Sequence, residues 1–458
     1  MAVDPRSARI GIVGGGVGGL MAAWELSRLG FQVDLHEAAS ELGGLASAFD
    51  FDGFRIERFY HFICRHDSTL IDTCRRIGID ERLKWRETRT GFFYDGRLYR
   101  FGSPIDLLRF RPLSLVDKAR FGLNVLYSRR FRTWSKLEDL PAKQWLIDQL
   151  GARTYSVIWD PLLRVKFDEY HEEISAAWMW HRIHRVATSR KSVFARERFG
   201  YLEGGSDLLI QTLATRAREA GATIRMQSRS EGLWTENGIC RGLRIGGENV
   251  PYDSVICAVP LPVYRKLIPS DDAAYAARLE TIRFIGVVCM ILRLKQAVSP
   301  NFWLNVHDPR IAFNGIIEYA NLNADPRLEG RSVVYVPYYL EASRPRYSFP
   351  DEQLFDEYTA ALQLLNPAFR REWVEGYRVF RAPHAQPICH RNFSEVVPPV
   401  ETPWKNCYML ESTQLYPADR VISGTLRLAQ DAVLRLLDDF GAAEQSGIRR
   451  RGAEEIPE

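Results

Sequence analysis

The sequence predicts an α/β protein that opens with a strand–helix–strand unit, and three observations lead to this prediction. Residues 8–13 are an apolar run typical of a buried parallel strand, and residues 14–19 follow at once with the spacing G-x-G-x-x-G. Apolar positions then recur on one face of a helix that Gly30 ends. A second strand over residues 31–35 closes beside the acid Glu37. This order is typical of parallel strands joined by a crossover helix.

The glycine-rich turn is typical of a Rossmann-like dinucleotide site. Gly14 permits a tight turn, Gly16 lets the backbone approach a pyrophosphate, and Gly19 lets the helix pack on the strand. The N-terminus of the helix directs unpaired N–H groups at the phosphates. Glu37 can accept hydrogen bonds from an adenosine ribose, and its charge would repel a 2′-phosphate, which argues against NADP. We therefore expect nucleotide contacts from Gly14, Gly15, Gly16, Gly18, Gly19 and Glu37.

Composition limits the class of protein. The 458 residues are 46% hydrophobic and carry a net charge of +4, which suits two or three globular domains and argues against a disordered chain or a dedicated nucleic-acid binder. Seven scattered cysteines without a C-x-x-C pair indicate neither a disulfide framework nor a metal site. The segment ahead of residue 10 lacks the apolar region of a signal peptide, and the longest apolar run, 284–292, is too short to span a membrane. We expect a cytoplasmic protein, soluble or peripheral to a membrane.

The residues after Glu37 separate the possible dinucleotides. Glu37 is followed by five residues and then by Gly43, Gly44 and Leu45. This acid–x5–G-G pattern resembles the continuation found in the FAD-dependent superfamily of amine oxidases, protoporphyrinogen oxidases and phytoene desaturases. The resemblance implies FAD as the cofactor, with the paired glycines bringing the backbone beside its pyrophosphate.

Later segments extend the resemblance along the whole chain. Residues 200–206 and the helix after them resemble the point at which the chain of this superfamily re-enters the FAD domain. Residues 253–260 resemble its element of an acid, an apolar strand, a small residue and proline. Residues 407–411 and the helix that ends near residue 437 resemble its closing strand and helix.

These segments predict how the chain divides. A discontinuous FAD-binding domain is expected over residues 1–95, 200–265 and 391–440. The insertions would form a substrate domain, helical over 96–199 and a mixed sheet over 266–390, with strands at 287–294, 311–319, 333–340 and 374–380. The last segment, 441–458, lacks an apolar pattern and is expected to be disordered.

The resemblance also implies which residues face the flavin. Residues 51–62 correspond to the segment that passes the flavin ring, which places Phe59, Tyr60 and His61 at the cofactor. His61 is the candidate catalytic residue, because an imidazole can bond the flavin or exchange a proton with substrate near neutral pH. The alternative is a histidine whose hydrogen bonds are satisfied within a loop. Further cofactor contacts are expected from Ser230, Glu411, Val421 and Ile422, with Glu411 in place of the aspartate usual in the family.

One departure from the family pattern bears on the reaction. Amine oxidases often carry a lysine near the flavin in the strand where this chain has residues 284–290, and this stretch contains none. We therefore expect hydride removal from a C–H or C–N bond of a small organic substrate, by an oxidase, dehydrogenase or desaturase. The alternative is an FAD-dependent sugar-nucleotide mutase, because residues 60–62 and 94–101 faintly resemble segments of galactopyranose mutases. A flavin-free binding protein is disfavoured by the intact glycines and Glu37.

The segment 104–132 combines basic side chains with large apolar ones. Three interpretations remain open: an element that contacts the surface of a membrane, a mouth that attracts an anionic substrate, and an ordinary solvated helix face.

Overall fold

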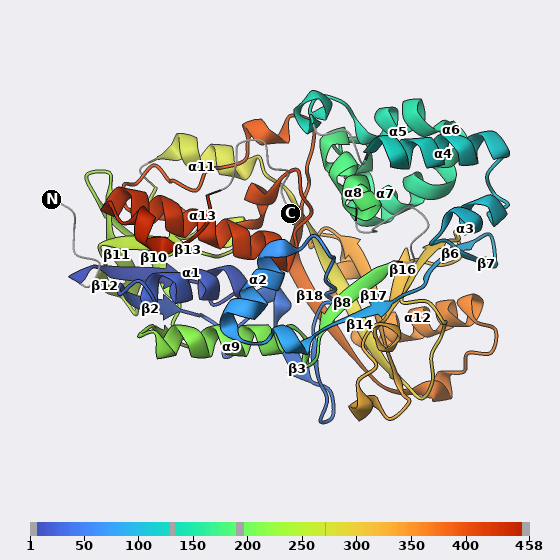
Figure 1. Cartoon of the computed structure of the whole chain (residues 1–458), viewed down its shortest axis with the longest axis horizontal. Coiled ribbons are helices and arrows are strands. Elements are labelled where there is room, and N and C mark those ends of the chain that lie inside the picture. Colours follow the sequence, from blue (N-terminus) through green and yellow to red (C-terminus); the bar gives the residue numbers. More distant parts are fainter. Residues whose placement is uncertain (1–6, 129–132, 189–196, 271, 451–458) are drawn as a thin grey trace.

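The computed structural model describes residues 7–128, 133–188, 197–270 and 272–450 (Figure 1). A five-stranded parallel sheet, in the order β19-β13-β1-β2-β9, forms the centre of the nucleotide-binding part. Its strands come from distant parts of the chain: β1 (Arg9–Val13), β2 (Gln32–His36), β9 (Thr223–Arg225), β13 (Ser254–Cys257) and β19 (Cys407–Met409). The predicted α/β fold with a discontinuous parallel sheet is confirmed.

Helix α1 (Val17–Ser27) is the most completely buried helix of this part. It packs against α9 (Gly205–Glu219) and α13 (Ile422–Phe440), and α2 (Ser68–Ile77) packs against both of these helices. The sequence predicted an α1 with one apolar face, yet every residue of α1 is buried. Because neighbouring helices cover its outer side, even its polar residues need partners inside the protein.

Smaller sheets surround the parallel one. Strands β10 (Ser230–Glu236), β11 (Ile239–Ile245) and β12 (Glu248–Pro251) form an antiparallel sheet that contacts β13. Two pairs complete this part: β3 (Ala48–Asp50) with β4 (Arg55–Glu57), and β5 (Leu83–Glu87) with β8 (Arg198–Leu202). The short helices α10 (Leu261–Tyr264) and α11 (Ala273–Glu280) follow β13.

A seven-stranded mixed sheet forms the wall of the substrate part, in the order β18-β14-β17-β16-β15-β6-β7. Its strands are β6 (Thr90–Tyr94), β7 (Arg97–Arg100), β14 (Phe284–Leu294), β15 (Trp303–His307), β16 (Gly315–Glu318), β17 (Ser332–Leu340) and β18 (Val374–Pro387), with α12 (Asp351–Leu365) between the last two. All four strands predicted here are present, although the one expected over 311–319 is shorter. Strand β6 pairs in parallel with β15, so residues 90–94 extend this sheet although the sequence assigned them to the FAD domain.

The first insertion is largely helical, as expected. It contains α3 (Pro104–Arg109), α4 (Leu115–Ser128), α5 (Ala142–Leu150), α6 (Ala152–Thr154), α7 (Asp160–Phe167) and α8 (Ala176–Thr188), grouped at the upper right of Figure 1. Helix α8 contacts α4 and α5, and α7 contacts β17 of the mixed sheet. Within the described ranges, no helix is long and apolar enough to cross a membrane.

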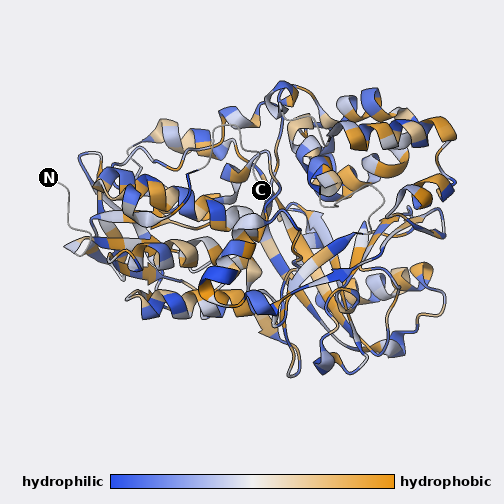
Figure 2. Ribbon diagram, in the orientation of Figure 1, coloured by the Kyte–Doolittle hydropathy of each residue, from blue (hydrophilic) through white to orange (hydrophobic). Residues whose placement is uncertain are grey.

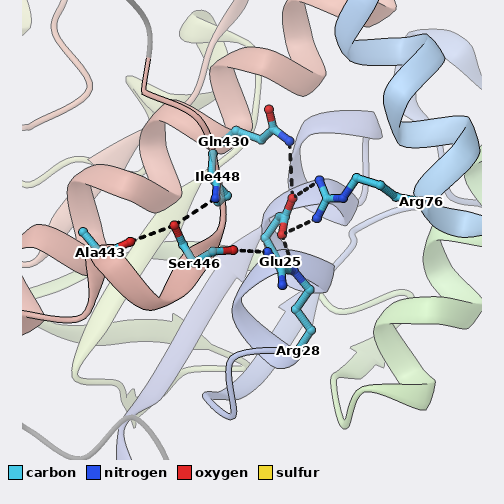
Figure 3. Close-up of polar contacts among 7 residues, drawn as sticks. All are labelled: Glu25, Arg28, Arg76, Gln430, Ala443, Ser446 and Ile448. Atoms are coloured by element: carbon cyan, nitrogen blue, oxygen red, sulfur yellow. Dashed lines mark hydrogen bonds and ion pairs between the residues drawn. The ribbon is translucent and has the colours of Figure 1, made fainter.

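The expectation of disorder after residue 440 is wrong for residues 441–450. A 3-10 helix, Ala443–Ser446, follows α13, and the buried Ser446 accepts a hydrogen bond from Arg28 through its carbonyl oxygen (Figure 3). Arg28 in turn pairs with the buried Glu25 of α1. Ala442, Ala443 and Ile448 of the same segment pack against the core of the nucleotide-binding part. Residues 451–458 of the predicted tail lie outside the described residues.

Candidate active site

One cavity lies where the nucleotide-binding part, the mixed sheet and the helical insertion meet. It encloses roughly 1620 Å³ of empty space, part of it open to solvent. The mixed sheet contributes Val287, Cys289 and Tyr339, and the helical insertion contributes Lys166, Arg182 and Arg185. Six residues that the sequence assigned to the cofactor also line it: Leu45, Phe59, Tyr60, His61, Val421 and Ile422.

The predicted glycines and Glu37 gather around the N-terminus of α1. Gly14 has φ +102°, and a Cβ there would lie 2.4 Å from the carbonyl oxygen of Ala258. A Cβ on Gly19 would lie 2.0 Å from the carbonyl oxygen of Gly14, so the tight turn and close packing require glycine at both positions. A Cβ on Gly16, in contrast, would meet no protein atom within 4 Å. Gly16 caps α1 without a side-chain hydrogen bond, so the start of the helix faces open space.

Glu37 holds the glycine loop in place. One carboxylate oxygen accepts the N–H of Gly15 at 2.7 Å, and the other accepts the N–H of Ala39 at the same distance. The N–H of Gly43 bonds the Gly15 carbonyl oxygen at 2.8 Å, which brings the second glycine pair against the first loop. Because each carboxylate oxygen has a second lone pair, these bonds leave Glu37 able to accept a ribose hydroxyl.

Ser230 and Glu411 lie outside the cavity around His61. Ser230 begins β10, and its buried hydroxyl has no hydrogen-bond partner among the described residues. The Glu411 carboxylate accepts from the N–H of Thr413 at 2.7 Å and from the hydroxyl of Ser412 at 2.8 Å, and so caps the short helix that follows. The structure therefore gives Glu411 a local structural role, and its cofactor contact stays a prediction.

His61 presents a free ring nitrogen. Nδ1 of the ring is buried and has no hydrogen-bond partner among the described residues. Burial and the neighbouring Arg420 lower the pKa of His61 to about 4. The imidazole is therefore neutral at pH 7. It can take part in a hydrogen bond, but the proton exchange near neutral pH suggested by the sequence is disfavoured.

A group of charged residues, which the sequence analysis did not find, lines the same cavity. Nζ of Lys166 lies 3.3 Å and Nη1 of Arg182 lies 2.7 Å from the same oxygen, Oδ2 of Asp419. Burial, followed by the charge of Arg182, lowers the pKa of Lys166 to about 7. Burial alone would raise the pKa of Asp419, but Lys166, Arg182 and the adjacent Arg420 hold it well below its usual range. No local pattern could have found this group, because its members come from α7, α8 and the segment before α13.

A second ion pair adds to the charge of the wall. Arg185 on α8 donates to both carboxylate oxygens of Asp67, at 2.9 and 3.1 Å. The remaining acid, Glu57, is buried, and this burial raises its pKa. The wall therefore carries more positive than negative charge at neutral pH. Across the described ranges, no three His, Cys, Asp or Glu side chains are grouped as a metal site requires.

Comparisons with known proteins show the family of this chain. The family described as flavin-containing amine oxidoreductase matches residues 17–444. A zeta-carotene-forming phytoene desaturase from Myxococcus xanthus is 25% identical over 358 residues, which are 70% of this chain and 67% of that protein. A zeta-carotene desaturase from Zea mays is 25% identical over 316 residues, and the match spans 63% of this chain and only 55% of the maize protein.

Solved structures share the fold at low identity. An oxidoreductase from Methanosarcina mazei superposes with a TM-score of 0.73 at 18% identity, covering 92% of this chain and 99% of that one. Reduced UDP-galactopyranose mutase gives 0.74 at 16% identity, with coverage of 96% and 97%. Putrescine oxidase bound to putrescine gives 0.70 at 16%, with coverage of 94% and 99%. At these identities the likeness concerns the fold alone.

The residues present fit FAD. The open space beside Gly16 and the uncapped start of α1 suit a pyrophosphate, and the carboxylate of Glu37 suits a ribose. Leu45 and His61 line the same cavity, and the unpartnered Nδ1 of His61 is a polar atom that could bond the flavin there. With the family match over nearly the whole chain, these features identify the protein as an FAD-dependent enzyme of the flavin-containing amine oxidoreductase family.

Proposed function

We propose that this enzyme removes hydride from a C–H or C–N bond of a small organic substrate that carries an anionic group. The observation that carries the proposal is one cavity lined both by His61 and Tyr60, the residues expected at the flavin, and by the basic residues Lys166, Arg182 and Arg420. An anion bound by these cations would hold the rest of the substrate inside the same cavity.

The side chains of the cavity divide the remaining tasks. FAD, when bound, accepts the hydride. Lys166 and Arg182 bind and orient the anionic group, and the unpartnered Nδ1 of neutral His61 is available for a hydrogen bond to the flavin or the substrate. Trp303 and Tyr339 line the cavity with aromatic surface that excludes water.

Two features of this site bear on the class of substrate. Strand β14 contributes Val287 and Cys289 to the cavity and contains no lysine. Because amine oxidases often carry a lysine in this strand, its absence argues against simple amine oxidation. The carotene named for the desaturase relatives is a hydrocarbon. A wall with four basic side chains is expensive to bury against a hydrocarbon, so the charged wall favours a different substrate.

The same basic wall favours one second candidate, a sugar-nucleotide mutase without net oxidation. Arginine pairs well with phosphate oxygens, and Arg182, Arg185 and Arg420 all line the cavity. The two candidates share the anion site and differ in net oxidation: after hydride removal an electron acceptor must reoxidise the flavin before the next turnover, whereas a mutase would leave substrate and flavin without a net change of oxidation state.

The test begins with the visible spectrum of the purified protein after addition of FAD. A library of small carboxylates and phosphate esters is then mixed anaerobically with the oxidised enzyme, and bleaching of the flavin is followed. We expect an anionic compound to bleach the flavin. In Arg182→Gln, the KM for this compound should rise while kcat is unchanged. Isomerisation of a sugar nucleotide by the reduced enzyme, without bleaching by any compound, would favour the mutase. Failure to bind FAD would contradict both candidates.

A further inference from the structure

The helical insertion exposes an unusual amount of hydrophobic surface. Eight of the eleven exposed large hydrophobic side chains in the described part of the chain lie between residues 98 and 127. Six of them, on α3 and α4, define what we call the α3–α4 apolar face: Ile105, Leu108, Leu115, Val116, Leu123 and Leu126, exposed by 48 to 75%. Figure 2 shows hydrophobic positions along the α4 ribbon. Nζ of Lys118 donates to the carbonyl oxygen of Leu108 at 2.8 Å, which ties the two helices together.

Helix α4 buries polar residues and exposes apolar ones, which is the reverse of an ordinary surface helix. Its buried residues are the polar Asp117, Asn124 and Ser128, whereas Leu115 and Leu123 are among its most exposed. A helix on the surface of a soluble domain normally buries its apolar stripe. Contiguous exposed apolar side chains mark a surface that binds something apolar.

Four arginines close to this face in the sequence have no acidic partner among the residues that the structure describes. Arg97, Arg100, Arg109 and Arg111 form no ion pair with any described residue, although arginines elsewhere in the structure commonly do. The two acids of the same segment accept hydrogen bonds from serines three residues earlier in the chain. Asp106 accepts from the hydroxyl of Ser103 at 2.8 Å, and Asp117 accepts from that of Ser114 at 2.7 Å.

We propose that the α3–α4 apolar face docks on the surface of an anionic lipid bilayer. Exposed leucines and isoleucine would enter the apolar boundary of the bilayer, and the unpaired arginines would lie against its charged headgroups. A second copy of this chain fits less well, because pairing two such faces would bring like charges together. A nucleic acid would use the arginines but would leave the leucines in water.

The experiment is cosedimentation of the full-length holoenzyme with vesicles of phosphatidylcholine alone or mixed with phosphatidylglycerol. Two double variants test the two components of the face: Leu115→Glu with Val116→Glu, and Arg109→Gln with Arg111→Gln. Leu115 and Val116 begin α4 and are exposed, so glutamate is tolerated there and favoured by the helix dipole. The matched control is Val263→Glu with Leu364→Glu, which makes the same change at two exposed apolar positions elsewhere.

We expect binding to the mixed vesicles only, and weaker binding as salt rises. Each lost positive charge near an anionic surface should lower the partition coefficient about fivefold, so the arginine variant should lose about 25-fold. The Leu115 variant should lose binding, and the control should keep it, with the flavin spectrum unchanged in all. No binding to anionic vesicles, or binding that both variants retain, would overturn the proposal. So would a dimer in sedimentation analysis that dissociates in the Leu115 variant without any vesicle binding.

Discussion

Lys166 on α7 and Asp419 before α13 are 253 positions apart in the chain, yet their charged atoms lie 3.3 Å apart in the wall of the cavity. Arg182 contacts the same carboxylate oxygen. One partly buried acid therefore holds two cations, and this arrangement leaves positive charge for a ligand. Because the pKa of Lys166 is about 7, that charge depends on pH in the physiological range.

The pH dependence of KM is expected to follow the protonation of Lys166. A bound anion favours the charged lysine, so KM should be lowest below pH 7 and should rise above it by up to about tenfold per pH unit. Lys166→Arg keeps the charge and should remove this rise, whereas Lys166→Met should have a high KM at every pH. Steady-state kinetics from pH 6 to 9 measure the effect. A rise above pH 7 that persists in Lys166→Arg would assign the ionisation to another group.

Gly16→Ala is expected to separate cofactor binding from folding. The added methyl group meets no protein atom within 4 Å, and Gly16 has φ −70°, which alanine adopts readily. The free energy of unfolding of the apoprotein should therefore hardly change, while the affinity for FAD should fall at least about tenfold, since the methyl occupies the space of the pyrophosphate.

The matched control for this variant is Gly122→Ala. Gly122 lies within α4, and a Cβ there also meets no atom within 4 Å. This change should stabilise the protein by about 0.5–1 kcal/mol and leave FAD affinity unchanged. Urea unfolding and flavin titration measure both quantities. Equal FAD affinity in wild type and Gly16→Ala would place the pyrophosphate elsewhere.

Replacing His61 should affect turnover more than cofactor binding. His61→Phe removes the unpartnered Nδ1 and should lower kcat at least about tenfold at full FAD content, because one hydrogen bond is lost. His61→Asn should recover part of this loss. Since the pKa of His61 is about 4, kcat should show no inflection near pH 6.5. An inflection there that disappears in His61→Asn would show that the imidazole titrates during catalysis after all.

Arg76 should be important for stability. The carboxylate of Glu25 is fully buried and accepts two hydrogen bonds from Arg76, at 2.6 and 2.9 Å (Figure 3). Arg76→Ala would leave this charge undercompensated and should lower the free energy of unfolding by about 3–5 kcal/mol. Arg75→Ala removes only an exposed pair with Asp72 and should change stability little.

The same pair has a predictable pH dependence. Burial raises the pKa of Glu25, but Arg76 and Arg28 outweigh it and the pKa is lowered overall. The pair's contribution is therefore present above about pH 4.5, the ordinary value, and is lost as pH falls further. Unfolding at pH 7 and pH 4 should show a smaller difference between wild type and Arg76→Ala at the lower pH. An unchanged difference would contradict this electrostatic account.

The sequence by itself determined the elements whose signals are local. The spacing of Gly14, Gly16 and Gly19 sets backbone conformations that need no Cβ, and the alternation of strand and helix before Glu37 follows from short-range apolar patterns. The four strands predicted in the second insertion were visible for the same reason. These signals are enough to predict a dinucleotide site, because the loop and the helix N-terminus that would form it are contiguous in the chain.

Only the tertiary structure decided what the enzyme presents to its substrate. Lys166, Arg182 and Asp419 meet because α7, α8 and the start of α13 pack around one cavity, and no periodicity encodes a contact across more than two hundred residues. The pairing of β6 with β15 and the anchoring of Ser446 by Arg28 are equally non-local. Pattern analysis likewise finds the apolar residues of α4 but cannot say which of them face outward. Burial is set by the neighbouring elements, so the side of a helix that meets solvent is known only once those neighbours are in place.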